Sequence, residues 1–300
     1  MPYEDGKIEN ILADALPEFV SQAERKAQDG ISPGDFIGDD GLVYCGVCKK
    51  PKQFRVNLLG WKTVSTPCDC EQARIDNAEM EYKANQRSLE ISRSLQELRD
   101  EGVIDSRLTG CRFADDDRKN PKQSDLVMRY VEQFEKMKAK NIGLLMYGGV
   151  GTGKTFLAGC IADALLKKGY FVISSSIATI ASAMRRNYGA DEPAIRKRLA
   201  NCDLLILDDF GTQRSTEAMN EQVYTIIDTR YNVKKPIVIT TNLTYEELAA
   251  KDAPMDKKRV YDRLMEMCTP IAFNGKSRRQ EIKREKQDRF FEIFAEDDEA

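Results

Sequence analysis

Short apolar runs alternate with helical stretches through the second half of the chain. The runs IGLLMY (142–147), DLLIL (203–207) and PIVITTN (236–242) have the length and bounding residues of buried strands. Between the first two, KTFLAGCIADALLKKG (154–169) predicts a helix that closes at a glycine. This alternation, which continues from 141 to 273, is typical of an α/β fold with a parallel sheet.

The chain before residue 141 has a different pattern. Residues 71–101 contain no Gly or Pro and are rich in strong helix formers with sparse apolar positions. They predict a long, mostly solvated helix or helix pair, which serves either as a connector or as a partner-binding helix. We therefore expect four parts: a small N-terminal domain (1–70), a helical linker (71–110), a large α/β domain (111–290) and an acidic tail (291–300).

Composition narrows the classes of function. A chain of 300 residues, 41% hydrophobic and 32% charged, can bury a full core. Its net charge of −3 argues against wholesale coating of nucleic acid but permits a local basic surface. The absence of histidine excludes Ser-His and Cys-His catalysis and metal sites that need imidazole. No run approaches the roughly 18 apolar residues of a membrane span, and residues 1–30 lack the pattern of a secretion signal, so we expect a cytoplasmic protein without a membrane partner.

The segment GGVGTGKT fits the phosphate-binding loop pattern G-x-x-x-x-G-K-[ST]. Its glycines allow backbone N–H groups to wrap phosphates, Lys154 reaches the β and γ oxygens of ATP, and the Thr155 hydroxyl is a ligand for Mg²⁺. A glycine-rich turn could merely join a strand to a helix, but the preceding apolar run and the following helix favour the phosphate loop. The residues expected to bind the nucleotide are Gly148, Gly149, Val150, Gly151, Thr152, Gly153, Lys154, Thr155 and Phe156.

Polar side chains follow two further predicted strands. Asp208 and Asp209 end the run 203–207, in the crevice where open α/β sheets bind ligands. Asp208 suits the acid that holds Mg²⁺, and Asp209 could polarise the water that attacks the γ-phosphate. A lone acid pair would more often be a turn or a helix cap. Asn242 ends the next strand, where an amide can sense the γ-phosphate and orient water; its alternative role as a helix cap is weakened because Thr244 begins a capping box of its own.

Four of the eight cysteines form two close pairs, Cys45 with Cys48 and Cys68 with Cys70. In a cytosolic protein these thiols predict a tetrahedral Zn²⁺ site; a redox pair or unligated thiols are the alternatives. The residues between the pairs are too polar to form a core, and a structural zinc, worth about 10–16 kcal/mol in small finger peptides, would supply stability. The other four cysteines are scattered and are expected to be ordinary buried residues.

The order of the motifs GGVGTGKT, LLILDDFG, VITTN, RVYDRL and FNGKSRR resembles the AAA+ ATPase domain of DnaC-type and DnaI-type replicative helicase loaders, which are related to IstB-type transposition helpers. The resemblance covers about 112–279. It implies ATP hydrolysis, with Asn242 as sensor 1, Arg263 as an arginine finger that reaches a neighbour's nucleotide, and Arg279 as sensor 2. The neighbouring Arg278 is expected to be a solvated charge.

The resemblance also implies a function in the initiation of DNA replication. A loader of this type places a DnaB-like helicase on single-stranded DNA, associates with itself in the ATP state, and docks on the helicase through an N-terminal zinc-binding part. Arg185, Arg186 and Tyr188 could contact the DNA, or the two arginines could belong to the solvent-exposed face of a packed helix. A transposition helper and a zinc-dependent nucleic-acid-binding ATP switch are the alternatives. Because AAA+ enzymes commonly carry Glu where this chain has Asp209, we expect slow intrinsic hydrolysis.

Overall fold

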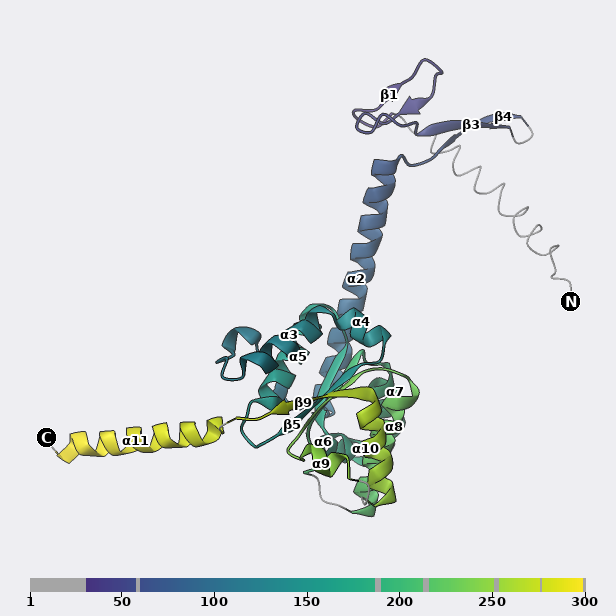
Figure 1. The fold of residues 1–300 in the computed structure, drawn as a ribbon. Helices are drawn as coiled ribbons and strands as arrows, with labels where there is room; N and C mark the ends of the chain where they lie inside the picture. The colour runs from purple at the N-terminus through teal and green to yellow at the C-terminus, as the bar shows by residue number, and fades with distance from the viewer. Residues whose placement is uncertain are drawn as a thin grey trace, which may run out of the picture. The chain divides into compact units, whose positions relative to one another are not determined.

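The computed structural model describes residues 31–57, 60–186, 190–212, 216–250, 254–275 and 277–298. The chain divides into two compact units, Met1–Gln86 and Arg87–Ala300, and the boundary falls inside helix α2 (Asp69–Asp100) (Figure 1). The first 30 residues of the expected N-terminal domain and the proposed DNA contact Tyr188 lie outside the described residues. The four-part division stays a prediction.

The first unit consists of two small antiparallel hairpins followed by the beginning of α2. The hairpins pair β1 (Phe36–Ile37) with β2 (Val43–Tyr44), and β3 (Gln53–Asn57) with β4 (Trp61–Ser65). Within 31–57 and 60–86, Cys45 and Cys68 are the only buried residues. The described part of this unit therefore has no apolar core that could hold the hairpins together by itself.

The second unit is built on a parallel sheet in the strand order β6-β7-β8-β5-β9, which confirms the predicted α/β fold. The strands are β5 (Gly143–Gly148), β6 (Val172–Ser176), β7 (Leu204–Phe210), β8 (Ile237–Thr241) and β9 (Cys268–Phe273). The three apolar runs of the sequence are the three adjacent strands β5, β8 and β7. Because parallel strands share one direction, their carboxyl ends meet at one edge, where the phosphate loop, the acid pair and Asn242 follow them.

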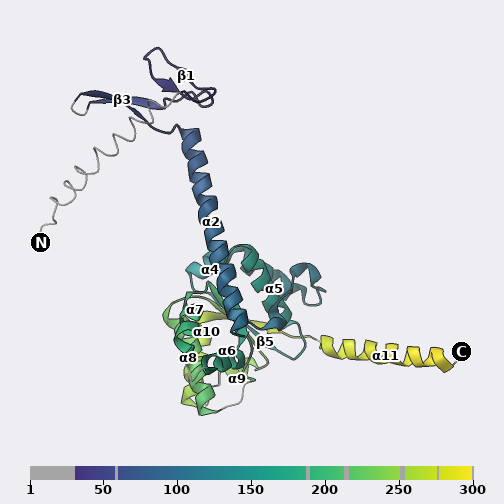
Figure 2. The same ribbon diagram turned by 180° about the vertical axis from the view of Figure 1, so that it is seen from behind.

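Both faces of the sheet are covered (Figures 1 and 2). Leu204 and Ile206 of β7 pack in one core cluster, and Leu205 and Leu207 pack in the other, so the continuous apolar run serves two layers. The first layer contains α3 (Pro121–Glu132), α4 (Phe134–Ala139) and α5 (Lys154–Lys167). The second contains the end of α2, α6 (Ile177–Met184), α7 (Glu192–Asn201), α8 (Glu217–Asn232), α9 (Tyr245–Leu248) and α10 (Met255–Met267).

Three shorter or more polar elements complete the unit. They are the 3₁₀ turns η1 (Ser106–Leu108) and η2 (Phe113–Asp115), and the helix α11 (Arg278–Asp298), which includes most of the expected acidic tail. No helix among the described residues has both the length and the apolar character needed to cross a membrane.

The fully buried Arg230 of α8 connects this helix to the end of α7 and to the segments that precede β7 and β8. Its guanidinium donates to the carbonyl oxygens of Leu199 at 2.8 Å, Cys202 at 2.9 Å and Pro236 at 2.7 Å. These carbonyls lie at the end of α7 and just before β7 and β8. Burial lowers the pKa of Arg230 from its ordinary value, and the carbonyl oxygens compensate its charge.

Candidate nucleotide-binding site and cysteine cluster

The phosphate loop connects β5 directly to α5, as its sequence predicts. Gly153 precedes the helix with a φ of +99°, in the left-handed region that favours glycine. A Cβ atom at Gly153 would also displace the Arg278 guanidinium, but the positive φ is what requires glycine here. The N-terminus of α5 therefore opens onto the loop, where its N–H groups and positive dipole end favour an anion.

Lys154 lies inside the loop with only 6% of its surface exposed. Its Nζ donates to the carbonyl oxygens of Gly148 at 2.8 Å and Gly149 at 2.7 Å, and to Asn242 Oδ1 at 3.0 Å. Burial lowers the pKa of Lys154. The ammonium group and the amide at the end of β8, predicted separately, thus share one hydrogen bond.

Asp208 is completely buried at the end of β7. Its Oδ1 accepts hydrogen bonds from Thr155 Oγ1 at 2.8 Å and Thr240 Oγ1 at 2.6 Å, whereas its Oδ2 has no hydrogen-bond partner. Burial raises the pKa of Asp208 above its ordinary value. A carboxylate oxygen beside a threonine hydroxyl is the donor set expected for Mg²⁺, and the unpartnered buried Oδ2 fits such an ion.

Asp209 occupies a break in the ladder between β7 and β8. The register shifts between Leu207 and Phe210, and Asp209 has a φ of +54°. Its N–H donates to Thr240 Oγ1 at 3.0 Å, and its Oδ2 accepts from Arg107 Nη1 at 3.0 Å. This bulge lets two consecutive carboxylates serve one site, since in a regular strand adjacent side chains point to opposite faces.

Lys154, Thr155 and Asp209 line a cavity of about 570 Å³. All the predicted nucleotide-binding residues from Val150 to Phe156 line it, together with Asp209, Asn242 and Arg279. Gly148 and Gly149 contribute carbonyls behind Lys154, and Asp208 lies beneath Thr155. The structure thus brings almost the whole predicted set to one place, from segments that are up to 131 residues apart in the chain (148 to 279).

Two arginines that line the cavity were not predicted to do so. Arg278 is not the solvated charge expected from the sequence: its side chain is 19% exposed and pairs with Asp117 at 2.6 Å. Its N–H donates to the Gly151 carbonyl at 3.0 Å, so the start of α11 is fastened to the phosphate loop. Arg107 comes from η1, before the first strand of the sheet. No motif in the sequence identifies Arg107, because its position depends on how η1 packs on the sheet.

Arg263 lies away from the cavity of its own chain. Its guanidinium stacks over the rings of Tyr224 at 4.8 Å and Tyr231 at 4.9 Å and pairs with Asp228. A finger that acts on a neighbour's nucleotide does not line its own cavity, so its predicted role stays a prediction. The two predicted DNA contacts that are described, Arg185 and Arg186, are exposed at the end of α6.

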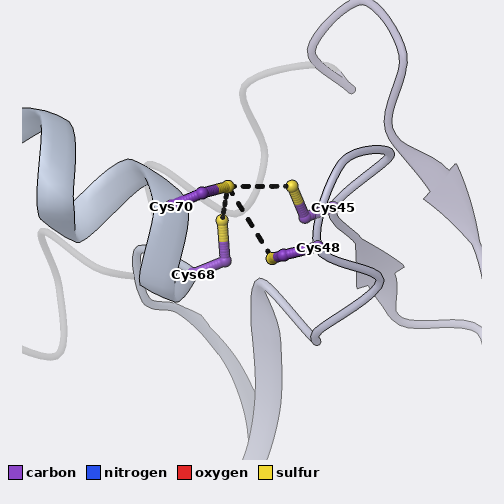
Figure 3. Close-up of side chains that lie close together, drawn as sticks. All are labelled: Cys45, Cys48, Cys68 and Cys70. Atoms are coloured by element: carbon purple, nitrogen blue, oxygen red, sulfur yellow. Dashed lines mark hydrogen bonds between the residues drawn. The ribbon is translucent and has the colours of Figure 1, made fainter.

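The four clustered cysteines of the first unit converge on one point (Figure 3). Cys45 and Cys48 come from the turn after β2, and Cys68 and Cys70 from the start of α2. Cys70 Sγ lies 3.4 Å from Cys45, 3.2 Å from Cys68 and 3.7 Å from Cys48, and all four sulfurs lie within 4.8 Å of one another. Zn–S bonds of about 2.3 Å in a tetrahedron give sulfur–sulfur edges of about 3.8 Å. The cluster fits Zn²⁺, and its fourfold convergence is unlike that of a single redox pair.

The hydrogen bonds of the cluster shift the pKa values of two of its thiols in opposite directions. The backbone N–H groups of Cys48 and Val47 lower the pKa of Cys45 to about 6. Hydrogen bonding of the Cys70 thiol to Cys68 and Cys45 raises the pKa of Cys70 to about 12. A bound divalent zinc would displace the Cys70 proton and balance the charge of four neighbouring thiolates.

A glycine-rich loop between a strand and a helix, an acid pair at the end of a neighbouring parallel strand and an amide at the end of a third define this chain as a P-loop protein of the AAA+ type. The model of the family of IstB-like ATP binding proteins matches residues 118–286, more than half of the chain. The chain belongs to this family, as the motif resemblance predicted.

Two curated relatives with similar sequences are named replicative helicase loaders. The chain is 32% identical over 160 residues to the replicative helicase loader DnaC of Escherichia coli (strain K12), which covers 51% of this chain and 62% of the relative. It is 28% identical over 210 residues to the replicative helicase loader DnaI of Bacillus subtilis (strain 168), which covers 64% of this chain and 66% of the relative. The matches thus span less than two thirds of each relative. A crystal structure of the DnaC helicase loader has the same fold, with a TM-score of 0.51 and 24% identity over 57% of this chain and all of that chain.

Proposed function

We propose that this chain is an ATP-dependent loader that places a DnaB-like replicative helicase on single-stranded DNA during the initiation of replication. The observation that carries the proposal is the 32% identity to a replicative helicase loader, together with an intact phosphate-loop site. In this proposal, ATP binding favours self-association and a grip on DNA, and hydrolysis releases the helicase.

The site residues have separate tasks in ATP hydrolysis. The loop N–H groups and the N-terminus of α5 bind the phosphates, and Lys154 exchanges its carbonyl partners for β and γ oxygens. Thr155 and Asp208 would hold Mg²⁺, which neutralises phosphate charge when bound. Asp209 accepts a proton from the attacking water, and Asn242, whose amide contacts Lys154, orients that water near the γ-phosphate.

Cations around the transferring phosphoryl group supply the remaining charge compensation. Arg279 lines the cavity as expected of a sensor 2 residue, and Arg278 beside it is fastened to the loop. Arg263, which is held between two tyrosine rings, would act on the nucleotide of a neighbouring copy. A finger supplied in this way is worth about 10³–10⁵ in rate, which would make hydrolysis depend on self-association.

The first unit is the proposed docking part. The four clustered cysteines would hold Zn²⁺, which would stabilise hairpins that have little buried apolar surface among their described residues. Phe54 and Trp61, at 44% and 75% exposure, are available on the second hairpin for a protein partner. Together these features support the proposed role of the first unit as a helicase-docking module.

Native mass spectrometry with the replicative helicase of the same host tests this function. We expect a stable complex that contains both proteins, and stimulation of helicase assembly on single-stranded DNA that requires ATP. Lys154→Ala should abolish ATP hydrolysis and loading while leaving helicase binding intact. Lys167→Ala is the matched control, because Lys167 is an exposed lysine of the same helix that pairs with Asp163. Absence of any helicase complex would refute the loader function.

The family match favours one second candidate. Because the matching family model describes IstB-like proteins, a transposition helper that delivers a transposase is the alternative. The same mass-spectrometric experiment separates the two functions, since a helper would bind its cognate transposase and leave the replicative helicase free.

A further inference from the structure

Arg107 makes contacts to three carboxylates at the rim of the nucleotide cavity. Its guanidinium lies 2.7 Å from Asp105 Oδ2, 3.0 Å from Asp209 Oδ2 and 3.7 Å from the unpartnered Oδ2 of Asp208. Among the described residues, Arg107 is the cation that forms ion pairs with both Asp208 and Asp209. The side chain is 54% exposed, so the contact can open without unfolding the surrounding core.

The backbone around Arg107 is held firmly. Asp105 caps η1 by accepting the Arg107 N–H at 2.9 Å, and its own N–H donates to the Ser174 carbonyl of β6 at 3.0 Å. Hydrogen bonding to Arg107 lowers the pKa of Asp105. Leu108, the next residue of η1, is buried in the layer that contains α5. The guanidinium therefore points at the acid pair because η1 is fixed to the sheet, and Asp105 aligns it.

This contact bears on the water-activating role of Asp209. Asp209 Oδ2 accepts a hydrogen bond from Arg107, which occupies one acceptor position of that oxygen and holds the carboxylate in one orientation while the ion pair persists. A carboxylate held in this orientation is less free to align with the attacking water, which slows hydrolysis, and the contact does not block the loop that binds the phosphates.

We propose that Arg107 is a positioning residue that restrains Asp209 and keeps ATP hydrolysis slow until the ion pair opens. Because the Arg107 side chain is about half exposed, rotation of its guanidinium away from the acid pair would release Asp209 without any change in the backbone of η1 or in the phosphate loop. This inference rests on the proposed ATPase function and adds to it a restraint on the rate of ATP hydrolysis.

The test compares steady-state ATP hydrolysis by the full-length protein and its Arg107→Gln and Arg107→Lys variants. Removing a half-exposed ion pair should raise kcat about two- to fivefold with KM for ATP near the wild-type value. Arg107→Lys keeps the charge but loses the planar fork, so its kcat should lie between those of the wild type and Arg107→Gln. Arg118→Gln is the matched control, because Arg118 pairs with Asp125 and does not line the cavity.

An unchanged or lower kcat in Arg107→Gln would overturn the restraint, and a fall to the level of Asp209→Asn would instead assign Arg107 to stabilisation of the transferring phosphoryl group. If thermal melting shows that Arg107→Gln does not fold, Arg107→Lys decides by the same criterion. Lys154→Ala separates the two proposals. The ATPase function fails if the wild type does not hydrolyse ATP or if Lys154→Ala is equally active. Only the restraint fails if the wild type is active, Lys154→Ala is inactive and Arg107→Gln is no faster.

Discussion

Replacing Asp208 by asparagine should stabilise the nucleotide-free protein while destroying its site. The carboxylate is completely buried, and its Oδ2 has no hydrogen bond. Asparagine keeps the Oδ1 acceptor for the two threonine hydroxyls and removes the charge. A buried neutral polar group without a partner costs about 1–3 kcal/mol and a charged one costs more. The amide NH2 that replaces Oδ2 keeps the neutral cost, so the gain is only the extra cost of the charge, part of which Arg107 at 3.7 Å already offsets. We therefore expect a gain of about 1 kcal/mol in the free energy of unfolding, or about 2–4 °C in Tm for a unit of this size.

The gain should depend on pH in a defined direction. Burial raises the pKa of folded Asp208 above that of the unfolded chain, about 3.9. Below the unfolded value, Asp208 is protonated in both states and its burial costs no charge. As pH rises through the unfolded pKa and then the folded one, the wild type loses stability that Asp208→Asn keeps. The difference in stability between the two proteins should widen as the pH rises above about 4, until Asp208 is ionised in the folded protein.

Nucleotide should reverse the order of stability. A ligand at about 100 times its Kd stabilises the native state by about 2.7 kcal/mol, and Asp208→Asn, which lacks the carboxylate for Mg²⁺, should gain much less from Mg·ATP. Thermal melts by circular dichroism, with and without Mg·ATP at several pH values, measure all three effects. Asp163→Asn, at a partly exposed position of α5, is the control. A nucleotide-free Asp208→Asn protein that is less stable than the wild type at pH 7 would refute the reasoning.

Three further results are expected. Arg230→Met should lower the free energy of unfolding, measured by urea denaturation, by about 3 kcal/mol or more, because several buried carbonyls lose their donor. The control Arg118→Met, at an exposed ion pair, should change it by about 0.5 kcal/mol or less. Purified protein should release one equivalent of Zn²⁺ to a chromophoric chelator and lose the structure of its first unit. The Cys48→Ser variant should bind zinc more weakly. A full-length protein that contains no zinc and is unaffected by the chelator would contradict the cluster assignment. Arg278→Gln and Arg279→Gln should each weaken ATP binding in equilibrium titrations, and a loss confined to Arg279→Gln would show that Arg278 is only structural.

The exposure of Trp61 determines how the zinc site is best measured. At 75% exposure on β4, this single tryptophan is already largely in contact with water. Its fluorescence should therefore change little when the hairpin opens, and direct measurement of released metal is the more sensitive assay. A large emission shift on chelation would show that Trp61 is covered in solution by a partner or by another copy.

The sequence by itself determined the features that depend on neighbours in the chain. The phosphate loop, the apolar runs that became adjacent parallel strands, and the paired cysteines are local patterns whose chemistry follows from residue type and spacing. These patterns were sufficient for the α/β fold, for the family and for most residues of the cavity. A buried strand has a local signature in its short apolar run, and a phosphate loop has one in the fixed spacing of its glycines, lysine and threonine.

The tertiary structure alone decided which cations meet the acid pair. Arg107 reaches Asp209 only because η1 hydrogen-bonds to β6, and Arg278 reaches the phosphate loop only because α11 begins beside it. An arginine has no local signature that distinguishes a solvated charge from one that faces a site, since its long side chain can extend in either direction. The left-handed backbone of Asp209 likewise depends on the bulge between β7 and β8. Such contacts are long-range, and their free energies are set by packing between segments that no single stretch of sequence contains.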